Sequence, residues 1–386
     1  MFSPLPQVAR RVVPLALLAL TFLLPGAAAG PDPLPFYTVT LLGTLGGETS
    51  EALSINERGQ VVGKAETADG ETHAFLWEYG GIRDLGTLPG GSYSEARDIN
   101  RVGDIVGVST NADGYRRATY WSGDEVIDVG TLGGNNSWAN AIDDNGELVG
   151  AAERAPDSAS TYWPNYWAFR SRLRGGYPEW RMVALPQLHL NPLRDERALF
   201  SEAFEIRNGL VLGHVFVNHL TDTGYWPLTW KNNQLWIGRY GKGWFWPRSI
   251  NRRSQVVGQF SGHSDETSSW ITTLKGIRLP WPQHDIRPPS GSGTRAHYPE
   301  ARGINDAGTV VGSLVPREPL EAPPVAAFIY RSHRSTLLSP LVPRRDGWKI
   351  VAANAINDRG QIVGQAEREG RRVACLLTPV RSGGAR

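Results

Sequence analysis

The sequence predicts an all-β fold, a seven-bladed β-propeller made of four-stranded antiparallel blades. The main evidence is a recurring phrase: EALSINERGQVVG at 51–63 returns as EARDINRVGDIVG at 95–107, WANAIDDNGELVG at 138–150, EARGINDAGTVVG at 300–312 and AANAINDRGQIVG at 352–364. Two weaker copies, EAFEIRNGLVLG at 202–213 and WPRSINRRSQVVG at 246–258, bring the count to seven. A fixed period of this length indicates that one supersecondary unit is reused along the chain.

Each copy divides into four short strands, which we take here from the first copy. Strand one, Ala52–Asn56, begins with a small residue, and strand two, Gln60–Val62, ends at Gly63. Between them lies an Asn-x-x-Gly turn, in which Asn bonds its own backbone and Gly supplies a positive φ. Strand three is His73–Trp77 and strand four is Ile82–Leu88. Short strands of this composition, separated by turn signals, are typical of all-β proteins, and no window sustains a helical period.

The two ends of the chain complement each other. The last copy stops after its third strand, at VACLLTPV (373–380), while a spare fourth strand, YTVTLLGTLGG (37–47), precedes the first copy. Pairing Thr38–Leu45 with Val373–Leu377 would close the ring and remove an exposed edge. The alternative architecture, a linear β-solenoid, has no use for this complementarity. A recurring small residue also fits an innermost strand, where blades converge; it is Ala at 52, 96, 139, 203, 301 and 353.

The N-terminus reads as a secretory signal peptide. Arg10 and Arg11 precede an apolar run, Val12–Leu24, and Ala27 and Ala29 are placed for an A-x-A cleavage site. We therefore expect residues 1–29 to be removed and residues 30–386 to form one propeller domain, either periplasmic or secreted to the medium. The apolar run is short for a membrane span and nothing longer follows, so we expect no membrane insertion.

Charge and cysteine content exclude several classes of function. Lys and Arg number 40 against 38 Asp and Glu, and two of the arginines leave with the signal peptide. A chain close to neutral lacks the basic face that nucleic acids require, so we expect no nucleic-acid partner. The single Cys375 excludes an intrachain disulfide, and its place in a third strand predicts a buried thiol. Asp-Asn-Gly elements such as Asp143–Gly146 coincide with the hairpin turn and lack alternating acidic ligands, so we expect neither metal nor cofactor.

Two stretches of the chain resemble a known repeat. LGTLGGETSEALSINERGQVVGKAETADGETHAFLW and DLGTLPGGSYSEARDINRVGDIVG are similar to the HAF repeat of predicted extracellular bacterial proteins, named for the triplet present here as His73-Ala74-Phe75. The resemblance is specific in copies one to three, six and seven, and weak in copies four and five. It implies an exported, propeller-like protein and no particular reaction, because propellers carry both enzymes and passive scaffolds.

Departures from the repeat gather on one predicted face. In a propeller, the turns between strands one and two and between three and four share one face, and the remaining connections share the other. The first face keeps short turns, except at Arg172–Arg181. The second face collects the insertions, at Ala152–Tyr166, Pro186–Ser201, His214–Tyr225, Arg239–Trp246, Pro280–Pro299, Val315–Pro324 and Ser339–Ile350. Insertions on one face of a repeat array commonly mark its binding face.

These insertions are rich in aromatic residues. Trp and Tyr rings on a polar face can stack on sugar rings or anchor a peptide, although they can also only pack the long loops onto the blades. We expect a monomeric binding module for a polysaccharide or an extended peptide, centred on blades three to six. The candidate ligand-binding residues are Trp163, Tyr166, Trp226, Trp244, Trp246, Trp281, His284 and Tyr298.

Two alternative functions stay open. One is an exported carbohydrate-active hydrolase or lyase that uses His and carboxylates of the same loops, since general acid-base chemistry needs such groups together. The candidates are His189, Asp195, Glu196, His263, Asp265, His284, Asp285, His297 and Glu300. No nucleophile-elbow, H-x-x-x-H or phosphate-loop motif supports this reading. The other alternative is a structural component of an envelope or surface assembly, which predicts a protein partner and no small ligand.

Overall fold

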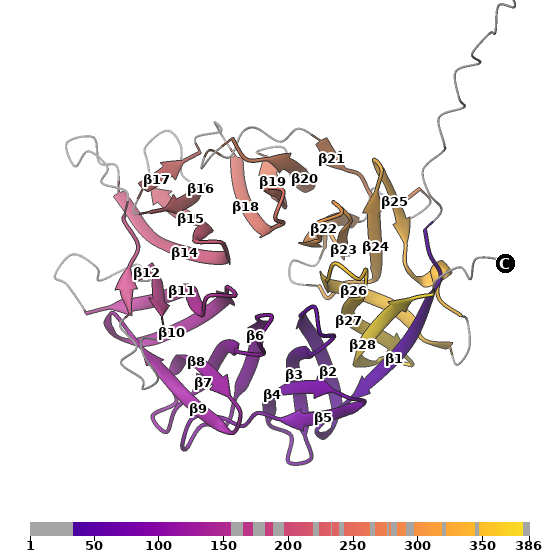
Figure 1. Ribbon diagram of the computed structural model, residues 1–386, viewed down its shortest axis with the longest axis horizontal. Coiled ribbons are helices and arrows are strands. Elements are labelled where there is room, and N and C mark those ends of the chain that lie inside the picture. Colours follow the sequence, from indigo (N-terminus) through magenta and orange to yellow (C-terminus); the bar gives the residue numbers. More distant parts are fainter. Residues whose placement is uncertain are drawn as a thin grey trace, which may run out of the picture. The chain divides into compact units, whose positions relative to one another are not determined.

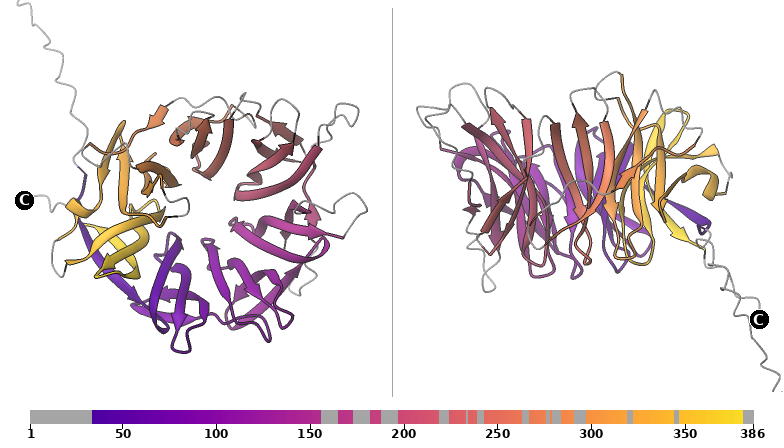
Figure 2. Two further views of the ribbon diagram at one scale, coloured as in Figure 1. Left: turned by 180° about the vertical axis from the view of Figure 1, so that it is seen from behind. Right: turned by 90° about the horizontal axis from the view of Figure 1, so that it is seen from above.

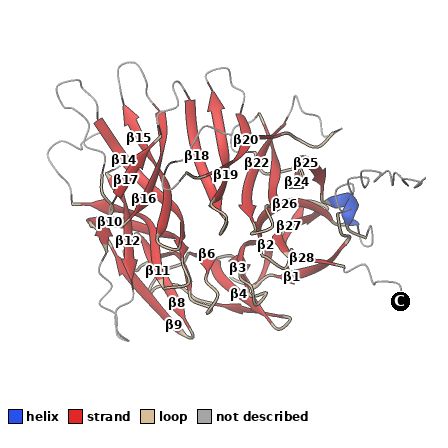
Figure 3. Ribbon diagram, turned by 45° about the horizontal axis from the view of Figure 1, so that its top comes forward, coloured by secondary structure: helices blue, strands red, loops and turns tan. Residues whose placement is uncertain are grey.

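A computed structural model confirms the seven-bladed β-propeller (Figure 1). It describes residues 34–155, 165–172, 182–187, 197–218, 224–232, 234–238, 243–262, 267–275, 278, 284–290, 297–318, 322–343 and 347–380. Contacts divide the chain into two units, Met1–Leu34 and Pro35–Arg386, and the propeller is the second. Strands supply nearly all the regular structure of the described residues (Figure 3), together with a 3-10 turn at Ser339–Leu341.

Each blade is one antiparallel sheet whose first strand lies nearest the ring axis (Figure 1). Blade one contains β2 (Gly46–Ile55), β3 (Val61–Thr67), β4 (Thr72–Glu78) and β5 (Gly81–Asp84). Blade two contains β6 (Ser94–Ile99), β7 (Ile105–Thr110), β8 (Arg116–Ser122) and β9 (Glu125–Gly130). Blade three contains β10 (Gly133–Ile142), β11 (Glu147–Arg154), β12 (Tyr166–Arg172) and β13 (Val183–Ala184).

The other blades repeat this order. Blade four contains β14 (Arg197–Arg207), β15 (Leu210–Asn218), β16 (Gly224–Lys231) and β17 (Gln234–Ile237). Blade five contains β18 (Gly243–Ile250), β19 (Gln255–Gly262), β20 (Thr267–Thr273) and β21 (His284–Ile286). Blade six contains β22 (His297–Ile304), β23 (Val310–Pro316), β24 (Ala326–Arg331) and β25 (Arg334–Leu337). Blade seven contains β26 (Lys349–Ile356), β27 (Ile362–Arg368), β28 (Arg371–Pro379) and β1 (Tyr37–Gly43).

The predicted closure is confirmed. Strand β1 pairs antiparallel with β28, with Val39 opposite Leu377 and Leu41 opposite Cys375, and it becomes the fourth strand of blade seven. Cys375 is fully buried, as predicted, and burial raises the pKa of its thiol to about 12. The first and last parts of the domain are therefore joined by a strand ladder, and β1 covers the edge of β28 that would otherwise be exposed.

Several strand boundaries differ from those predicted. The first strand begins six residues earlier than Ala52, at Gly46, so the Gly-Gly pair opens the strand instead of preceding it. The fourth strand ends at Asp84 and does not reach Leu88. Sequence pattern alone misses the early part of the first strand because its side chains are polar and partly exposed, so they carry no hydrophobic alternation.

Apolar side chains from adjacent blades form the core between them. Between blades two and three, for example, Val106 and Ala118 pack with Leu148 and Phe169, all buried. Buried serines of the first strands also bridge adjacent blades: the backbone N–H of Ala74 donates to Ser94 Oγ at 2.8 Å, and that of Ala374 donates to Ser50 Oγ at 2.8 Å. The second of these bonds ties blade seven to blade one.

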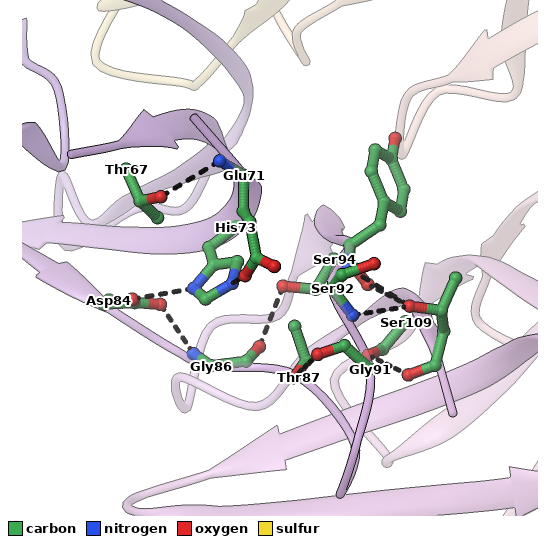
Figure 4. A network of polar contacts seen from close by, with 12 residues as sticks. Thr67, Glu71, His73, Asp84, Gly86, Thr87, Gly91, Ser92, Ser94 and Ser109 are labelled. Carbon is green, nitrogen blue, oxygen red and sulfur yellow. Dashed lines mark hydrogen bonds and ion pairs between the residues drawn. The ribbon is translucent and has the colours of Figure 1, made fainter. Parts of the chain in front are cut away.

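Figure 4 shows how His73 and the motif Asp84-Leu-Gly are held together. His73 Nδ1 lies 2.8 Å from Asp84 Oδ2, and the N–H of Gly86 donates to Asp84 Oδ1 at 2.7 Å. Ser94 Oγ then donates to the carbonyl of Gly86 at 2.8 Å. These contacts join strands three and four of blade one to blade two, so the most recognisable residues of the repeat have a structural role.

The Asn of each Asn-x-x-Gly turn links neighbouring blades. Asn357 Oδ1 accepts the N–H of Gln361, which closes its own turn as predicted. Its Nδ2 donates to the carbonyl of Asn56 in the next blade at 3.1 Å. The same bond between blades recurs from Asn251 to Asn305, Asn305 to Asn357, Asn56 to Asn100 and Asn100 to Asp143. We call this series the Asn relay.

The strands run between two faces of the ring (Figure 2). We call the face with the Asn-x-x-Gly turns the turn face, and the opposite one the loop face. The prediction that insertions lie almost solely on the loop face is wrong for blade five. Its fourth strand is His284–Ile286, so residues 274–283 join strands three and four and belong to the turn face. The short, polar β21 resembles a loop in sequence, which is why its register was missed.

Candidate functional site

A β-bulge in every innermost strand determines which side chains line the ring axis. In each of the seven blades the register shifts between the small residue of the repeat and the residue two positions later. The residue between them is left unpaired, and a bulge of this kind re-aims its side chain. The seven bulge residues are Leu53, Arg97, Asn140, Phe204, Arg248, Arg302 and Asn354.

All seven bulge residues line one cavity of about 290 Å³, which we call the channel cavity. It continues to the turn face, where Glu57, Arg101 and Asp144 also line it. Six arginines and five carboxylates line the channel cavity. The lining of the cavity is therefore rich in charged groups of both signs.

Two of these arginines, Arg97 and Arg302, belong to a belt of paired side chains. On one side, Arg97 donates from Nε to Glu95 at 3.0 Å and from Nη1 to Asn140 at 2.7 Å, and Asn140 Nδ2 donates to Glu202 at 2.8 Å. Burial alone would raise the pKa of Glu95, but Arg97, Lys64 and a hydrogen bond from Tyr93 outweigh it and hold that pKa at about 2. Glu95 is therefore a stable anion at physiological pH.

The belt continues through blades six, seven and one. Arg302 donates to Glu300 at 2.8 Å and to Asn354 at 3.0 Å, and Asn354 Nδ2 donates to Glu51 at 3.1 Å. Lys64 joins the two sides of the belt, since its Nζ lies 3.7 Å from Glu51 and 3.2 Å from Glu95. The belt therefore crosses the junction between the last and first blades, and it helps to hold the ring closed.

Two carboxylates that line the channel cavity but do not belong to the belt have a different environment. Asp98 and Glu205 both stand two positions after the small residue of the repeat, where the other blades have Ser, Ala or Gly. Burial raises the pKa of both groups, that of Glu205 to about 8. Asp98 accepts hydrogen bonds from Ser54 Oγ at 2.8 Å and from the N–H of Ile142 at 2.9 Å.

At the loop-face end of blades three to five, aromatic rings surround a carboxylate. We call this group the aromatic cluster: Trp138, Tyr166, Phe200, His214, Tyr225 and Trp246. Ring centroids of neighbouring members lie 4.6 to 5.5 Å apart in four contacts: Trp138–Tyr166, Tyr166–Phe200, His214–Tyr225 and Tyr225–Trp246. Contacts of this geometry are favourable for aromatic pairs.

Glu202 is the carboxylate at the centre of this cluster. Trp138 Nε1 donates to its Oε1 at 2.7 Å, and the charge of Glu202 acts on the hydroxyls of both Tyr166 and Tyr225. Burial and, to a lesser extent, the charge of Glu202 raise the pKa of Tyr166 to about 12. Burial, together with Arg248, lowers the pKa of His214 to about 3, so this imidazole is neutral at physiological pH. The cluster therefore combines ring faces with hydroxyl, indole and carboxylate groups.

Some of the predicted ligand-binding residues lie at this site. Tyr166 and Trp246 belong to the aromatic cluster and are half-buried. Tyr298 lies beside Glu300, and its pKa is raised mainly by its own burial and further by the charge of Glu300. Trp226 was also predicted to bind ligand, but it is only 4% exposed and packs in the core of blade four. It is therefore not available to a ligand. Trp163, Trp281 and the side chain of Trp244 lie outside the described residues.

His284 lies elsewhere. It begins the outermost strand of blade five, and its ring is 4.9 Å from that of His333 in blade six. These two residues, with Asp285 and Tyr330, line a separate pocket of about 760 Å³. Because Glu300 belongs to the innermost strand of blade six, the structure does not bring His284 to it. Among the described residues, no three His, Cys, Asp or Glu side chains converge as metal ligands do.

Sequence reasoning missed the channel residues. A signal was present, because the bulge position changes from Leu to Arg, Asn and Phe within an otherwise regular phrase. Without the bulge, however, that position would alternate into the space between blades. It can be assigned to the channel only when the pairing register is known.

Comparisons with known proteins support the fold. No family model and no curated protein matches the chain. An oligogalacturonate lyase in complex with manganese aligns with a TM-score of 0.55 at 12% identity, over 89% of this chain and 91% of that chain. The β-propeller domain of the Trilobed protease from Pyrococcus furiosus aligns with a TM-score of 0.50 at 11% identity, over 89% and 93%. A puromycin-hydrolyzing peptidase from Mycobacterium tuberculosis aligns with a TM-score of 0.50 at 11% identity, over 91% and 54%.

At this identity the likeness concerns the fold alone, because the same propeller serves unrelated activities. None of the helices in the described residues has the length and apolar composition needed to cross a bilayer.

Proposed function

We propose that the protein is an exported binding module that recognises a polysaccharide or an extended peptide at the aromatic cluster. Residues 1–29, with the features of a signal peptide, support export. The observation that carries the proposal is the arrangement around Glu202. Rings from three consecutive blades are held beside one carboxylate, with the indole N–H of Trp138 bonded to it.

The composition of the cluster suits such ligands. Sugar rings and peptide side chains both present apolar faces that stack on Trp and Tyr, together with hydroxyl or amide groups that donate to a carboxylate. Trp138, Tyr166, Tyr225 and Trp246 are all half-buried, so part of each side chain stays accessible at the loop face. The insertions predicted on that face would extend the same surface.

Binding can be measured by intrinsic Trp fluorescence of the mature protein against a panel of soluble polysaccharides and a peptide library. We expect Trp246→Ala to weaken binding at least about fivefold, since loss of one stacking anchor costs about 1–3 kcal/mol. Trp138→Phe keeps a ring but removes the N–H donor to Glu202, and should weaken binding less. Tyr79→Ala is the control, because Tyr79 is 99% exposed on the turn face of blade one.

Unchanged fluorescence with every polysaccharide and peptide would reject the proposal. So would equal affinities of the Trp246→Ala and Tyr79→Ala variants.

Hydrolase or lyase activity is a second candidate, favoured by one observation. Asp98 and Glu205 both line the channel cavity, and burial raises the pKa of both. A carboxyl group that acts as a general acid requires such a raised pKa. Product formation that is lost in Glu205→Gln while binding is retained would favour this candidate over a passive module. A co-purifying protein partner without any small ligand would instead favour a structural component of an envelope assembly.

A further inference from the structure

The Asn relay is interrupted at one place in the ring. It runs from blade five through blades six, seven, one and two, and it ends at Asp143 in blade three. Asp143 has no side-chain N–H to pass on, and blade four has Arg207 where the other blades have Asn or Asp. The interruption leaves a guanidinium, the most hydrogen-bond-rich cation in proteins, at the wall of the channel cavity.

Arg207 lacks a partner of its own. It makes no hydrogen bond or ion pair with any side chain in the described part of the protein, and its Nε is buried without an acceptor. Of the other five arginines that line the channel cavity, Arg97 and Arg302 are hydrogen-bonded to Glu95 and Glu300. Arg101 and Arg252 lie 3.6 and 3.3 Å from Asp144 and Asp306.

Two acids, Glu205 and Asp98, interact with the charge of Arg207, but neither forms a hydrogen bond or close ion pair with it among the described residues. Glu205 and Asp98 feel its charge, but burial outweighs that effect and raises the pKa of both, so Glu205 is mainly protonated at neutral pH. Both carboxyl groups already accept hydrogen bonds, Asp98 from Ser54 and Ile142, and Glu205 from the N–H of Ile206. A partly buried cation without a paired anion is unfavourable, and an incoming anion would relieve that cost.

Arg248 is the second weakly held cation. Its Nη2 lies 3.7 Å from Glu300, beyond hydrogen-bond distance, and its guanidinium lies over the ring of Phe204 at 5.7 Å. Burial is the main influence on its pKa and lowers it, which shows that its charge is incompletely compensated. Its Nε is also buried without an acceptor.

From this geometry we propose that the channel cavity binds a small anionic group, a carboxylate, phosphate or sulfate, at Arg207 with Arg248 as a second contact. Arg207 and Arg248 both have an Nε without an acceptor and make no side-chain hydrogen bond among the described residues, whereas Arg302, whose Nε also lacks an acceptor, is hydrogen-bonded to Glu300 and Asn354. A guanidinium offers paired N–H groups that match the oxygens of such anions. A cavity of about 290 Å³ limits the ligand to a small molecule or to the end of a longer one.

This proposal does not depend on the ligand of the aromatic cluster, although Arg248 also acts on His214 of that cluster. The test is isothermal titration of the full mature chain with sodium phosphate, sodium sulfate and sodium glucuronate, at constant ionic strength kept with sodium chloride. The three salts distinguish the possible sources of the anion. We expect saturable binding of at least one of them, and at least a tenfold loss of affinity in Arg207→Gln, the size of effect typical of a lost charged hydrogen bond.

Matched variants keep the test interpretable. Arg248→Gln should lose affinity less than Arg207→Gln, and Arg207→Lys should fall between wild type and Arg207→Gln, because Lys keeps the charge but loses the planar fork. Arg252→Gln is the control, since Arg252 lines the same cavity but is paired with Asp306, and its affinity should stay within twofold. Thermal melts without ligand show that each variant is folded.

Two results would overturn the proposal. One is the absence of saturable heat with all three anions beyond that of chloride. The other is an equal loss of affinity in Arg207→Gln and Arg252→Gln, which would indicate a diffuse charge effect. Neither result bears on the aromatic cluster, whose variants respond to the polysaccharide and peptide panel instead.

Discussion

At the scale of single residues, the repeat separates structural from functional positions. Asp84, Asn357 and the buried serines recur because they make the bonds that join strands and blades. The bulge residues vary because their side chains enter the channel, where packing does not fix their type. Positions that change within an otherwise regular repeat are therefore the better functional candidates.

The first prediction concerns Glu205. Its pKa is raised to about 8 in the folded protein, against an ordinary value of 4.5. Between these two pH values the folded protein keeps a proton that the unfolded chain releases, so stability falls as pH rises from 4.5 to 8. Glu205→Gln should remove this dependence and make the protein more stable at pH 9, by at most about 5 kcal/mol for a shift from 4.5 to about 8.

The measurement is urea denaturation of both proteins at pH 4, 7 and 9. The two should be equally stable at pH 4, where the carboxyl group is protonated in both states. A constant difference across the three pH values would contradict the assignment of the shift to Glu205.

The second prediction concerns the Asn relay. Asn357→Ala removes the bond to the carbonyl of Asn56 as well as the turn bonds to Arg359 and Gln361, and should cost about 2–3 kcal/mol. Asn111 closes a similar turn through the N–H groups of Asp113 and Tyr115, without a relay bond to the next blade. Asn111→Ala should therefore cost about 1 kcal/mol or less. Equal costs in chemical denaturation would mean that the bond between blades adds nothing.

At the scale of elements, β1 is the strand whose contribution is most easily isolated. It supplies the outer strand of blade seven, and its partner β28 would otherwise be an exposed sheet edge. A chain that begins at Leu45 should melt at a clearly lower temperature and should aggregate, because unpaired edges template association.

Calorimetry and light scattering of the two chains test this. Removal of residues 381–386 instead, which lie beyond β28, is the matched truncation and should leave the melting temperature unchanged. If the chain that begins at Leu45 melts like wild type, the ring does not depend on β1.

At the scale of the whole molecule, the prediction concerns export. If residues 1–29 form a signal peptide, the mature protein should begin at Gly30, which mass spectrometry of the exported protein would show. Replacement of Leu18 by Arg in the apolar run should block export and leave the full-length chain inside the cell. A secreted protein that still begins at Met1 would contradict cleavage at Ala29.

The sequence by itself determined the number of blades, the order of their strands, the Asn-x-x-Gly turns and the closure of the ring. The first three features follow from local turn signals and the regular period, and the closure follows from the complementary strands at the two ends, so all are readable without coordinates. The aromatic residues Tyr166 and Trp246 were also singled out from the sequence, because they end predicted insertions.

Only the tertiary structure decided which side chains meet at the axis. Arg97, Arg207 and Arg248 come from three different blades, and their proximity depends on the bulges and on how the blades pack. The same holds for His284, whose strand could not be recognised because it has only three residues, two of them polar, and carries no periodic signal. Burial and pairing of charges depend on distances between blades, and those distances are absent from a linear sequence because packing of whole sheets determines them.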